Sequence, residues 1–572
     1  MKTKKSILRI LVCAFFFGTS AVTFAQMPAL QWNKSYGGNT CSTPYTNNNA
    51  DIAGGVAQTP DGGFITVSSI NSKNGDFYGN HAVGTSHSTD VGLVKVNASG
   101  DTSWTKLLGG TGYDDGKSII VTKDGGYFFS AVTTTSNNGH VSGYNGSNDI
   151  WIVNTNSSGA ILWQTCTPGS SSETCATGQS VTQLVDSSYI VCGQTSTTSL
   201  TGYHGGQSDA YIAHYSKTGS LISYKCIGGT LTDEFKGVVA TSDGGYILVG
   251  YTTSANGDVT GYLGGGDMFV AKMTSSDVIS WTKCLGTSGY QEFGWTIQQD
   301  YDGGYLVGGN TKGGVAGYKG GLHDGLVIKI TSTGSVVRTT PYGGSKDDNI
   351  YSLALTPDSG FVFTAVTNSN DSNVTGGNYH PTSNDIWVGK VNKNGNLTSQ
   401  KCYGGKDPEV STCIIVSSDG GYVIFGHTNS SANGDVTSVG HTVTINGTVR
   451  ATTELWLFKL YTPIPPMANI VIDVIPHVLQ AAEVETDILI DEGGRIRSNI
   501  NQVNNITKVQ KFKVYYNQEN LVITKPTNDS EITIYDLSGR IVENFNSLKP
   551  GYYIAISVEP DKSFQKCKFI VN

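Results

Sequence analysis

The chain has 572 residues, of which 73 are Gly and 15 are Pro, and it carries a formal net charge of −8. So much Gly, nearly twice the usual share of about 7%, excludes a mainly helical protein, and 38% hydrophobic residues exclude a disordered one. The negative charge argues against nucleic acid or an anionic membrane as a partner.

Residues 1–25 have the pattern of a secretory signal peptide. Basic residues among the first nine positions precede an apolar run at 10–17, and small residues lead to Ala25. We therefore expect cleavage after Ala25. The apolar run is too short to cross a bilayer, and no other segment reaches about 20 apolar residues. The mature chain is expected to have no transmembrane segment.

A turn of the type Asp-Gly-Gly recurs every 56–63 residues through the middle of the chain. Its seven copies begin at Asp61, Asp124, Asp186, Asp243, Asp302, Asp358 and Asp419. An apolar or aromatic run follows each copy, and Asp-Gly between two apolar runs is a strong hairpin signal because Gly supplies the positive φ of the turn. Each copy therefore predicts a hairpin of two strands, a and b.

A second hairpin, of strands c and d, follows in every repeat. Strand c opens on an acid, at Asp90, Asp149, Asp209, Asp267, Asp324, Asp385 and Glu454. Strand d carries an aromatic residue in most copies, at Trp104, Trp163, Tyr224 and Trp281. Four short strands in each unit of about 60 residues predict an all-β fold, a seven-bladed β-propeller over residues 26–462.

The order of the strands at the two ends predicts a closed ring. The repeat region begins with a lone d strand at Trp32 and ends with a c strand at 455–460. If the N-terminal strand completes the last blade, two open sheet edges disappear. We therefore expect closure by that strand rather than an open solenoid.

The b–c and d–a loops are long and polar, so the face that they share is the expected binding face. The candidate ligand contacts are Asp76, Tyr144, Asp258, Tyr262 and Asp435 in the b–c loops and Asp114, Asp233 and Asp347 in the d–a loops. Loop acids suit Ca²⁺, and exposed Tyr and Asn suit a sugar or a peptide. The same residues can also satisfy turn amides and join the blades. Because the pattern repeats in every blade, we favour this structural interpretation and assign no cofactor, with Ca²⁺ as an alternative.

The nine cysteines that follow the leader stand at irregular positions, which is not the pattern of a disulfide framework. Cys226 and Cys284 recur at one position of the repeat, where we expect small buried hydrophobic residues.

The mature chain shows no nucleophile elbow, zinc-protease helix or phosphate loop. The segment 241–245 resembles the Asp-box turn of sialidases, but those enzymes bind the substrate carboxylate with three arginines, and the propeller region has only Arg338 and Arg450. Acids on the open face leave a polysaccharide hydrolase or lyase as an alternative. We favour a non-catalytic protein.

After a Pro-containing stretch the repeat stops, and residues 463–509 read as a linker and an ambiguous segment. From about residue 510 the pattern becomes alternating strands, with turns at 538–539 and 549–551. Residues 510–572 are therefore predicted to form a small C-terminal β-sandwich.

The motifs at 534–542, 548–554 and 568–571 resemble the C-terminal sorting domain of the type IX secretion system of Bacteroidetes. The residues that carry the resemblance are Tyr535, Asp536, Gly539, Arg540, Gly551 and Tyr553. One departure is the segment 515–518, Tyr-Tyr-Asn-Gln, where the family usually opens with Tyr-Pro-Asn-Pro. The preceding repeats are similar to Gly-rich repeats of other secreted proteins from that phylum.

This resemblance implies export through the periplasm and the type IX translocon, to the medium or the outer-membrane surface. Together with the propeller, it predicts a secreted or cell-surface protein that binds a glycan or a protein ligand. A purely structural surface protein is a further alternative.

Overall fold

The computed structural model describes residues 27–38, 50–72, 74–78, 81, 88–375, 383–438, 440–445 and 448–461, and the backbone of seven strands between 487 and 571. This described part contains strands and no helix, so none that is long and apolar enough to cross a membrane. The expected leader with Ala25, and most of the linker 463–509, lie outside the described residues.

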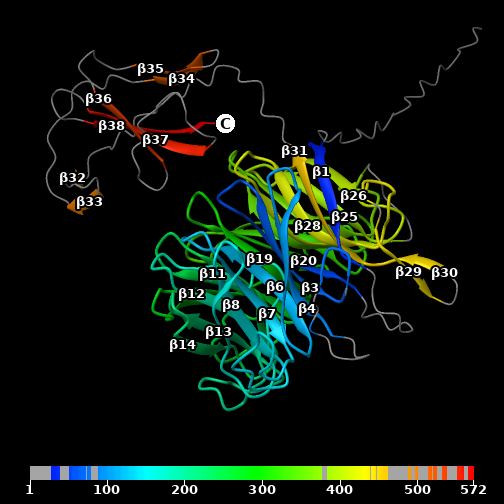
Figure 1. Cartoon of the computed structure of the whole chain (residues 1–572). Helices are drawn as coiled ribbons and strands as arrows, with labels where there is room; N and C mark the ends of the chain where they lie inside the picture. Colours follow the sequence, from blue (N-terminus) through cyan, green and yellow to red (C-terminus); the bar gives the residue numbers. More distant parts are fainter. Residues whose placement is uncertain are drawn as a thin grey trace, which may run out of the picture.

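The strands form seven antiparallel blades arranged in a ring, as predicted (Figure 1). Blade 1 contains β2 (Ile52–Gln58), β3 (Phe64–Ile70), β4 (Asp90–Val96) and β5 (Thr102–Leu108). Blade 2 contains β6 (Asp114–Val121), β7 (Tyr127–Thr133), β8 (Asp149–Thr155) and β9 (Ile161–Cys166). Blade 3 contains β10 (Glu173–Thr174), β11 (Val181–Gln183), β12 (Tyr189–Thr195), β13 (Asp209–Tyr215) and β14 (Leu221–Ile227). Blade 4 contains β15 (Asp233–Ala240), β16 (Tyr246–Thr252), β17 (Asp267–Met273) and β18 (Ile279–Leu285).

The remaining three blades complete the ring in the same order. Blade 5 contains β19 (Glu292–Gln299), β20 (Tyr305–Thr311), β21 (Asp324–Ile330) and β22 (Val336–Tyr342). Blade 6 contains β23 (Asp348–Leu355), β24 (Phe361–Thr367), β25 (Asp385–Val391) and β26 (Leu397–Tyr403). Blade 7 contains β27 (Glu409–Val416), β28 (Tyr422–Thr428), β31 (Glu454–Tyr461) and β1 (Ala29–Tyr36).

The N-terminal strand closes the ring, as the strand order predicted. β1 pairs antiparallel with β31, with Tyr36 opposite Leu455, and Figure 1 shows the blue β1 beside the yellow β31. One element was not anticipated: a hairpin of β29 (Thr442–Ile445) and β30 (Thr448–Ala451) lies between β28 and β31.

Each Asp-Gly-Gly turn is held by its own aspartate. In blade 1, Asp61 Oδ1 accepts hydrogen bonds from Gly63 N at 3.0 Å and from Thr59 Oγ1, and Gly62 has a φ of 81°. Blade 3 has Ser187 at the position of Gly62, with a φ of 73°, which is uncommon for a residue with a Cβ. The turn geometry therefore persists where the glycine is lost.

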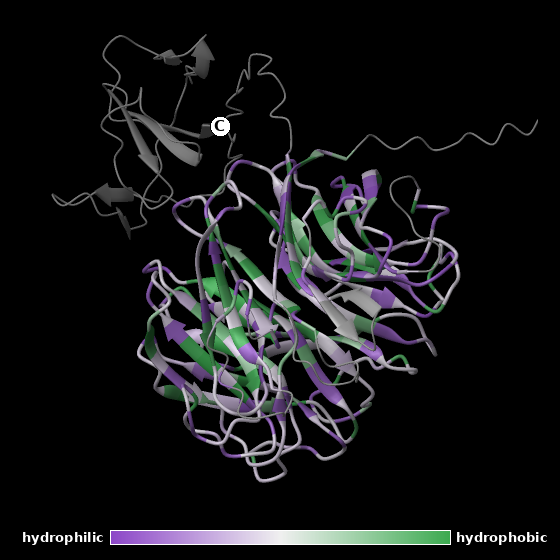
Figure 2. Cartoon of the chain, turned by 45° about the vertical axis from the view of Figure 1, so that its right-hand side comes forward, coloured by the Kyte–Doolittle hydropathy of each residue, from purple (hydrophilic) through white to green (hydrophobic). Residues whose placement is uncertain are grey.

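The hydrophobic core is divided among the junctions between blades. Seven clusters of buried side chains each draw on two neighbouring blades, so that every junction of the ring has its own cluster. Figure 2 shows the hydrophobic residues along the strands. Cys226 and Cys284 are buried in these clusters, as predicted, and the seven described cysteines outside the C-terminal strands are free thiols.

Blade 3 departs from the repeat at the centre of the ring, because residues 175–180 interrupt its innermost strand between β10 and β11. Gly178 N donates to Lys117 O of blade 2. Gln179 exchanges hydrogen bonds with the backbone of Ile297 in blade 5, at 2.8 and 3.0 Å. A Cβ on Gly178 would lie 3.1 Å from Thr412 O of blade 7. This loop therefore fills the middle of the ring.

At the level of the backbone, the strands after residue 510 follow the predicted pattern, whereas the two strands between 487 and 499 lie in the ambiguous segment, where no strand was predicted. β32 (Asp487–Ile490) pairs with β33 (Ile496–Asn499), and β34 (Lys513–Asn517) pairs with β35 (Asn520–Thr524). A three-stranded sheet contains β36 (Glu531–Asp536), β37 (Gly551–Val558) and β38 (Phe564–Val571). The packing of these strands into a sandwich stays a prediction.

Candidate functional site

The eight predicted ligand contacts all belong to loops or strand starts of the expected face, but they do not converge on one place. In the described part of the chain, no hydrogen bond or ion pair joins two of them. They are distributed over blades 1, 2, 4 and 7 and the d–a loop that precedes blade 6.

Three of the predicted aspartates lie in b–c loops and contact the preceding blade. Asp76 Oδ2 accepts from Gly37 N at 3.0 Å, and Asp258 Oδ2 lies 3.6 Å from His204 Nε2. Asp435 Oδ1 lies 3.1 Å from Lys401 Nζ. Each carboxylate therefore joins two neighbouring blades.

The two predicted tyrosines are half-buried beneath this face. Tyr144 and Tyr262 pack against the buried clusters of their junctions, and the Tyr144 hydroxyl donates to Ser147 O at 3.0 Å. Burial raises the pKa of both phenols. Each ring therefore packs partly against a buried cluster and is partly exposed at the surface.

The predicted acids of the d–a loops are turned inward to different extents. Asp114 and Asp233 have no exposed surface. Asp114 accepts from Gly110 N, from Thr133 Oγ1 at 2.5 Å and from Thr135 Oγ1 at 2.9 Å. Asp347 is partly exposed and accepts from the backbone N–H groups of Leu322 and His323. These contacts satisfy turn amides and hydroxyls within the junctions.

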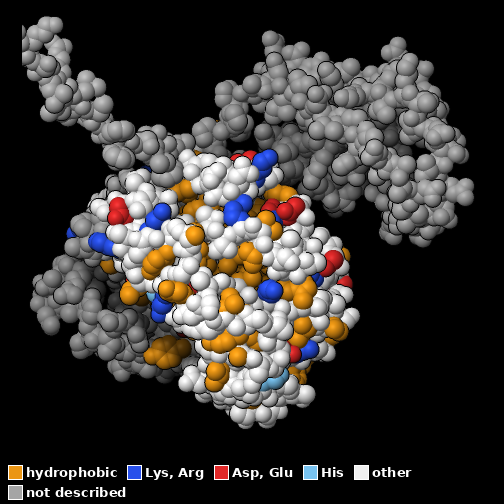
Figure 3. Space-filling model, turned by 180° about the vertical axis from the view of Figure 1, so that it is seen from behind, with side chains coloured by type: hydrophobic (Ala, Val, Ile, Leu, Met, Phe, Trp, Pro, Cys, Tyr) orange, Lys and Arg blue, Asp and Glu red, His pale blue; other side chains and the backbone are white. Residues whose placement is uncertain are grey.

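Every junction holds two carboxyl groups, one from the start of a c strand and one from the start of the next a strand. The pairs are Asp90 with Asp114, Asp149 with Glu173, Asp209 with Asp233, Asp267 with Glu292, Asp324 with Asp348, Asp385 with Glu409, and Glu454 with Asp51. All fourteen are at most 3% exposed. Charged side chains are scattered on the face shown in Figure 3.

Burial raises the pKa of most of these acids, and in each pair one carboxylate raises the pKa of its partner further. The pKa of Asp149 rises to about 6 and that of Glu292 to about 7. The described residues hold no group of three or more His, Cys, Asp or Glu side chains suited to a metal ion. Two carboxylates fall short of the six to eight oxygen ligands that Ca²⁺ takes.

The opposite face, formed by the a–b and c–d turns, has a repeated wedge at its blade junctions. In four junctions a Trp of strand d lies over the glycine in the c–d turn of the next blade. The same Trp lies beside the first aromatic residue of that blade's b strand, with ring centroids 5.9–6.4 Å apart. These residues are Trp32, Trp104, Trp163 and Trp281. The indole of Trp163 also donates to Lys217 O of that turn at 3.0 Å.

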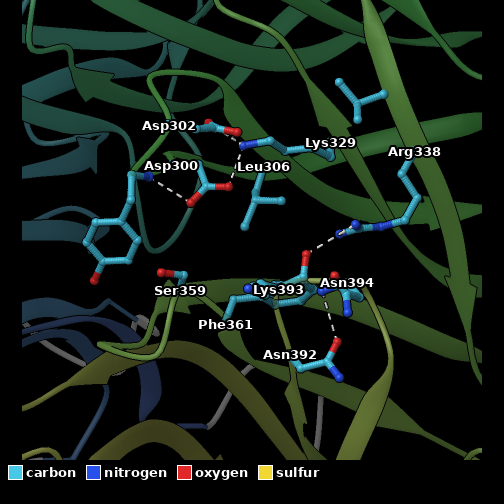
Figure 4. Close-up of a pocket in the computed structure, with 12 residues that line it drawn as sticks. Asp300, Asp302, Leu306, Lys329, Arg338, Ser359, Phe361, Asn392, Lys393 and Asn394 are labelled. Carbon is cyan, nitrogen blue, oxygen red and sulfur yellow. Dashed lines mark hydrogen bonds and ion pairs between the residues drawn. The ribbon is translucent and has the colours of Figure 1, made fainter. Parts of the chain in front are cut away.

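Arg338 takes the place of this Trp between blades 5 and 6. It stands opposite Lys329 in the strand register, as Trp281 stands opposite Lys272. Its Nη1 donates to Lys393 O at 3.3 Å, the carbonyl that corresponds to Lys217 O. A guanidinium is narrower than an indole, and a pocket of about 450 Å³ lies here (Figure 4).

A second departure from the repeat forms the adjacent wall of the pocket. Asp300 stands where most other blades have Thr or Ser, and its carboxylate forms an ion pair with Lys329. Lys329 Nζ also lies 2.6 Å from Asp302 Oδ1. Burial acts to raise the pKa of Asp302, but Lys329 holds it below its usual value. Figure 4 shows this group across the pocket from Phe361 and the 392–394 turn.

The rim of the pocket combines apolar and polar side chains that face solvent. Tyr301 is 61% exposed and Val337 60% exposed. Lys393 and Asn394 are exposed on the c–d turn of blade 6, whereas the side-chain Oδ1 of Asn392 accepts from the backbone N–H groups of residues 394 and 396. The pocket therefore offers one exposed aromatic ring, hydrogen-bonding groups and cations around a single hollow.

The two remaining junctions fill the same wedge differently. Between blades 6 and 7, Ser399 replaces the Trp and its hydroxyl contacts Met27 Sδ, which is buried there. Between blades 3 and 4, Asp277 accepts from Tyr246 Oη at 2.7 Å and also contacts Ser223. Neither arrangement includes the arginine found between blades 5 and 6.

At the junction of blades 3 and 4, Ser188, His214 and Asp277 have the spacing of an acyl-transfer triad. Ser188 Oγ lies 2.8 Å from His214 Nε2, and His214 Nδ1 lies 2.9 Å from Asp277 Oδ2. Ser188 is only 4% exposed, however, and its hydroxyl also bonds to Asp186 Oδ1 at 2.6 Å. Substrate has no path to so buried an oxygen, so we interpret the array as structural.

The same position in five other blades supports this interpretation. A lysine stands there in place of His214, and it forms an ion pair with the aspartate of the a–b turn. The array of blade 3 is therefore a variant of a repeated link between strand c and the turn.

The sequence analysis did not identify the Arg338 pocket. A signal was present, because Arg338 stands where the recognised tryptophans of strand d recur. The predicted aromatic Tyr224 lies one position beyond this column of residues, in which Ser223 stands. The sequence alone does not show that a Trp in this column fills the gap between two blades, so the effect of Arg338 could not be predicted.

Comparison with known proteins finds no family match and only distant structural likenesses. No family model matches the chain, and no curated protein matches it. Among solved structures, the WD40 domain of Pan2 from Neurospora crassa is 9% identical, with 77% of this chain and 99% of that chain covered and a TM-score of 0.41. The phage phi92 endosialidase is 9% identical, covering 94% of this chain and 87% of that chain, with a TM-score of 0.37. The Hadza microbial sialidase Hz136 is 11% identical, covering 56% and 63%, with a TM-score of 0.33.

Proposed function

We propose that this chain is an exported, non-catalytic β-propeller that binds a carbohydrate in the pocket between blades 5 and 6. The observation that carries the proposal is the replacement of the junction Trp by Arg338, which accompanies a hollow lined by polar groups. A repeated motif serves the repeat, whereas a ligand site is expected to depart from it. This pocket departs from it at two positions, 300 and 338.

The lining of the pocket suits a sugar. Sugar rings present apolar C–H faces, which pack on exposed aromatic rings such as Tyr301. They also present hydroxyls that need both donors and acceptors. Asn394 supplies both, Asp302 supplies acceptors, and Arg338 supplies donors.

Export is the second part of the proposal. Tyr535 and Asp536 of the sorting motif lie at the end of β36, opposite Ile554 and Tyr553 of β37, so two parts of the motif are adjacent. Gly551 opens β37, whereas Gly539 and Arg540 lie outside the described residues. We propose that the type IX translocon recognises this region after the N-terminal signal has taken the chain to the periplasm.

Deletion of residues 510–572 in the native host tests export. The truncated protein should accumulate in the periplasm, whereas the full chain should reach the medium or the cell surface. Equal amounts outside the cell for both forms would overturn this part of the proposal.

A polysaccharide array probed with the mature full-length protein tests binding. We expect retention on at least one glycan and no new reducing or unsaturated ends after prolonged incubation. Release of such ends would favour the carbohydrate-active enzyme. Absence of any glycan binding would favour a purely structural protein.

A further inference from the structure

The cations of the pocket differ in how they are neutralised. Lys329 is buried and bound by both Asp300 and Asp302. Arg338 and Lys393, by contrast, form no ion pair with a carboxylate among the described residues. The uncompensated positive charge of the pocket therefore lies on the side formed by strand β22 and the c–d turn of blade 6.

We infer that the pocket takes an anionic saccharide, with the carboxylate or sulfate group of the sugar held by Arg338 and Lys393. This inference rests on the proposed carbohydrate-binding function and names its ligand class.

The chemistry of Arg338 fits this assignment. The Nη1 bond to Lys393 O fixes one side of the guanidinium and leaves its other donors for a ligand. A guanidinium presents paired donors in one plane, which match the two oxygens of a carboxylate or the oxygens of a sulfate ester. Lys393 adds a second positive charge beside it on an exposed turn.

The charge of the rest of the protein would not by itself attract an anionic saccharide, so binding would depend on the cations of this pocket. The chain carries a net charge of −8, so its long-range field repels an anionic polymer. Charged side chains are scattered singly on the face in Figure 3 and form no broad basic area there. Binding of an anionic saccharide would therefore depend on the local pair of cations.

The fit also explains the departure from Trp. An indole at this position would pack on the turn glycine, as Trp281 does on Gly334. Arg338 keeps that contact with Gly395 and the hydrogen bond to the turn carbonyl, and it adds a charge. The substitution keeps the link between the blades while changing the chemistry of the surface.

The test uses the mature full-length protein and matched probes. Polygalacturonate is compared with its fully methyl-esterified form, and dextran sulfate with dextran, by calorimetry at low ionic strength. The two pairs distinguish a carboxylate from a sulfate ester. We expect binding to at least one charged member and an affinity at least tenfold lower for its neutral counterpart.

The variants locate the binding group. Arg338→Gln should weaken binding by about tenfold, as expected for loss of a charge-assisted pair, and Arg338→Lys should weaken it less. Lys393→Gln should also weaken it. Lys217→Gln is the matched control, because Lys217 holds the same place in the c–d turn of blade 3 and is 57% exposed on the same face.

Each outcome decides between the two proposals. Equal losses in Lys217→Gln and Lys393→Gln would show non-specific charge and overturn this inference. Binding only to neutral glycans, unchanged in folded Arg338→Gln, would also overturn it and leave the carbohydrate-binding function standing. Absence of binding to every saccharide would overturn the function itself. Circular dichroism of each variant confirms that it is folded.

Discussion

Asp324 Oδ1 and Asp348 Oδ2 point to one place in the junction between blades 5 and 6. A Cβ added to Gly343 would lie 3.1 Å from the first oxygen and 2.7 Å from the second. Asp324 Oδ2 accepts from Lys319 N, while its Oδ1 has no hydrogen-bond partner in the described chain. Burial raises the pKa of Asp324 to about 7 and that of Asp348 to about 6. One proton shared between the two groups would satisfy the pair near neutral pH.

The protein should lose stability as the pH rises from 5 to 8. The unfolded Asp324 releases its proton near 3.8 and the folded one near 7, so the folded chain holds more protons in between. The free energy of unfolding therefore falls as the pH rises through this window. Thermal unfolding at constant ionic strength measures it, and a Tm that is flat or rising from pH 5 to 8 would contradict the interpretation.

Asp324→Asn should flatten part of this pH dependence. The amide imitates the protonated acid, and its carbonyl oxygen can still accept from Lys319 N. The variant should be more stable than the natural chain at pH 8 and similar to it at pH 5. Asp101→Asn is the control: this carboxyl is exposed and Lys34 lowers its pKa, so the slope above pH 5 should not change.

Gly343→Ala should destabilise the propeller by about 1–3 kcal/mol, the usual cost of overpacking. The added methyl would press on Asp348 Oδ2 and would come within 3.2 Å of Asp348 Cβ, which the strand holds in place. Denaturant unfolding measures the loss. Gly440→Ala is the matched control, because its Cβ would lie no closer than 3.4 Å to the carboxyl of Glu454. Equal effects in the two variants would rule out the crowding explanation.

The seven blades and their closure could be predicted because the Asp-Gly-Gly turns and the lone strand at Trp32 are local features with fixed spacing. The loop at the centre of the ring was not predicted. Glu173 and Asp186 are thirteen positions apart, whereas the equivalent residues of every other blade are ten positions apart. The three extra residues are visible in the sequence. That the loop reaches Ile297 in blade 5 depends on closure of the ring, which brings the two blades close together.

The burial of the acids and the position of the pocket could not be predicted from the sequence, for a different reason. An acid at the start of a strand, such as Asp114, is expected from the sequence to be exposed. Its burial depends on hydrogen bonds from Thr133 and Thr135, which only the folded blade brings close to it. Blade 1 also carries extra residues at 39–49 and 83–89, which lie almost entirely outside the described residues. The pocket instead depends on Arg338, whose meaning comes from comparison with the folded Trp positions.

Removal of residues 26–38 should prevent stable closure of the ring. Without β1, strand β31 becomes an exposed edge, and removal of the buried Tyr36 leaves a gap in the core between blades 7 and 1. We expect aggregation or a Tm lower by roughly 10 °C or more. Replacement of 442–451, the β29–β30 hairpin, by a short Gly-Ser linker is the control and should leave the Tm within a few degrees. A truncated protein as stable as this control would contradict closure by β1.

Arg338→Trp should restore the wedge found in four other junctions. The indole would pack over Gly395 and donate to Lys393 O, as Trp163 does over Gly219 and to Lys217 O. The Tm should be equal to or higher than that of the natural chain, while saccharide binding should be lost because the ring occupies the hollow. A stable variant with undiminished binding would place the ligand elsewhere.

The array of Ser188, His214 and Asp277 should hold the junction of blades 3 and 4 together without catalysing a reaction. Asp277→Ala removes the shared acceptor of His214, Ser223 and Tyr246, and loss of one partner from a buried charged network costs about 3–5 kcal/mol. Ser188→Ala should cost less, because it removes one hydroxyl. A fluorophosphonate probe should leave the folded protein unlabelled, since Ser188 is only 4% exposed. Labelling that disappears in Ser188→Ala would instead identify a nucleophile and revive the enzyme interpretation.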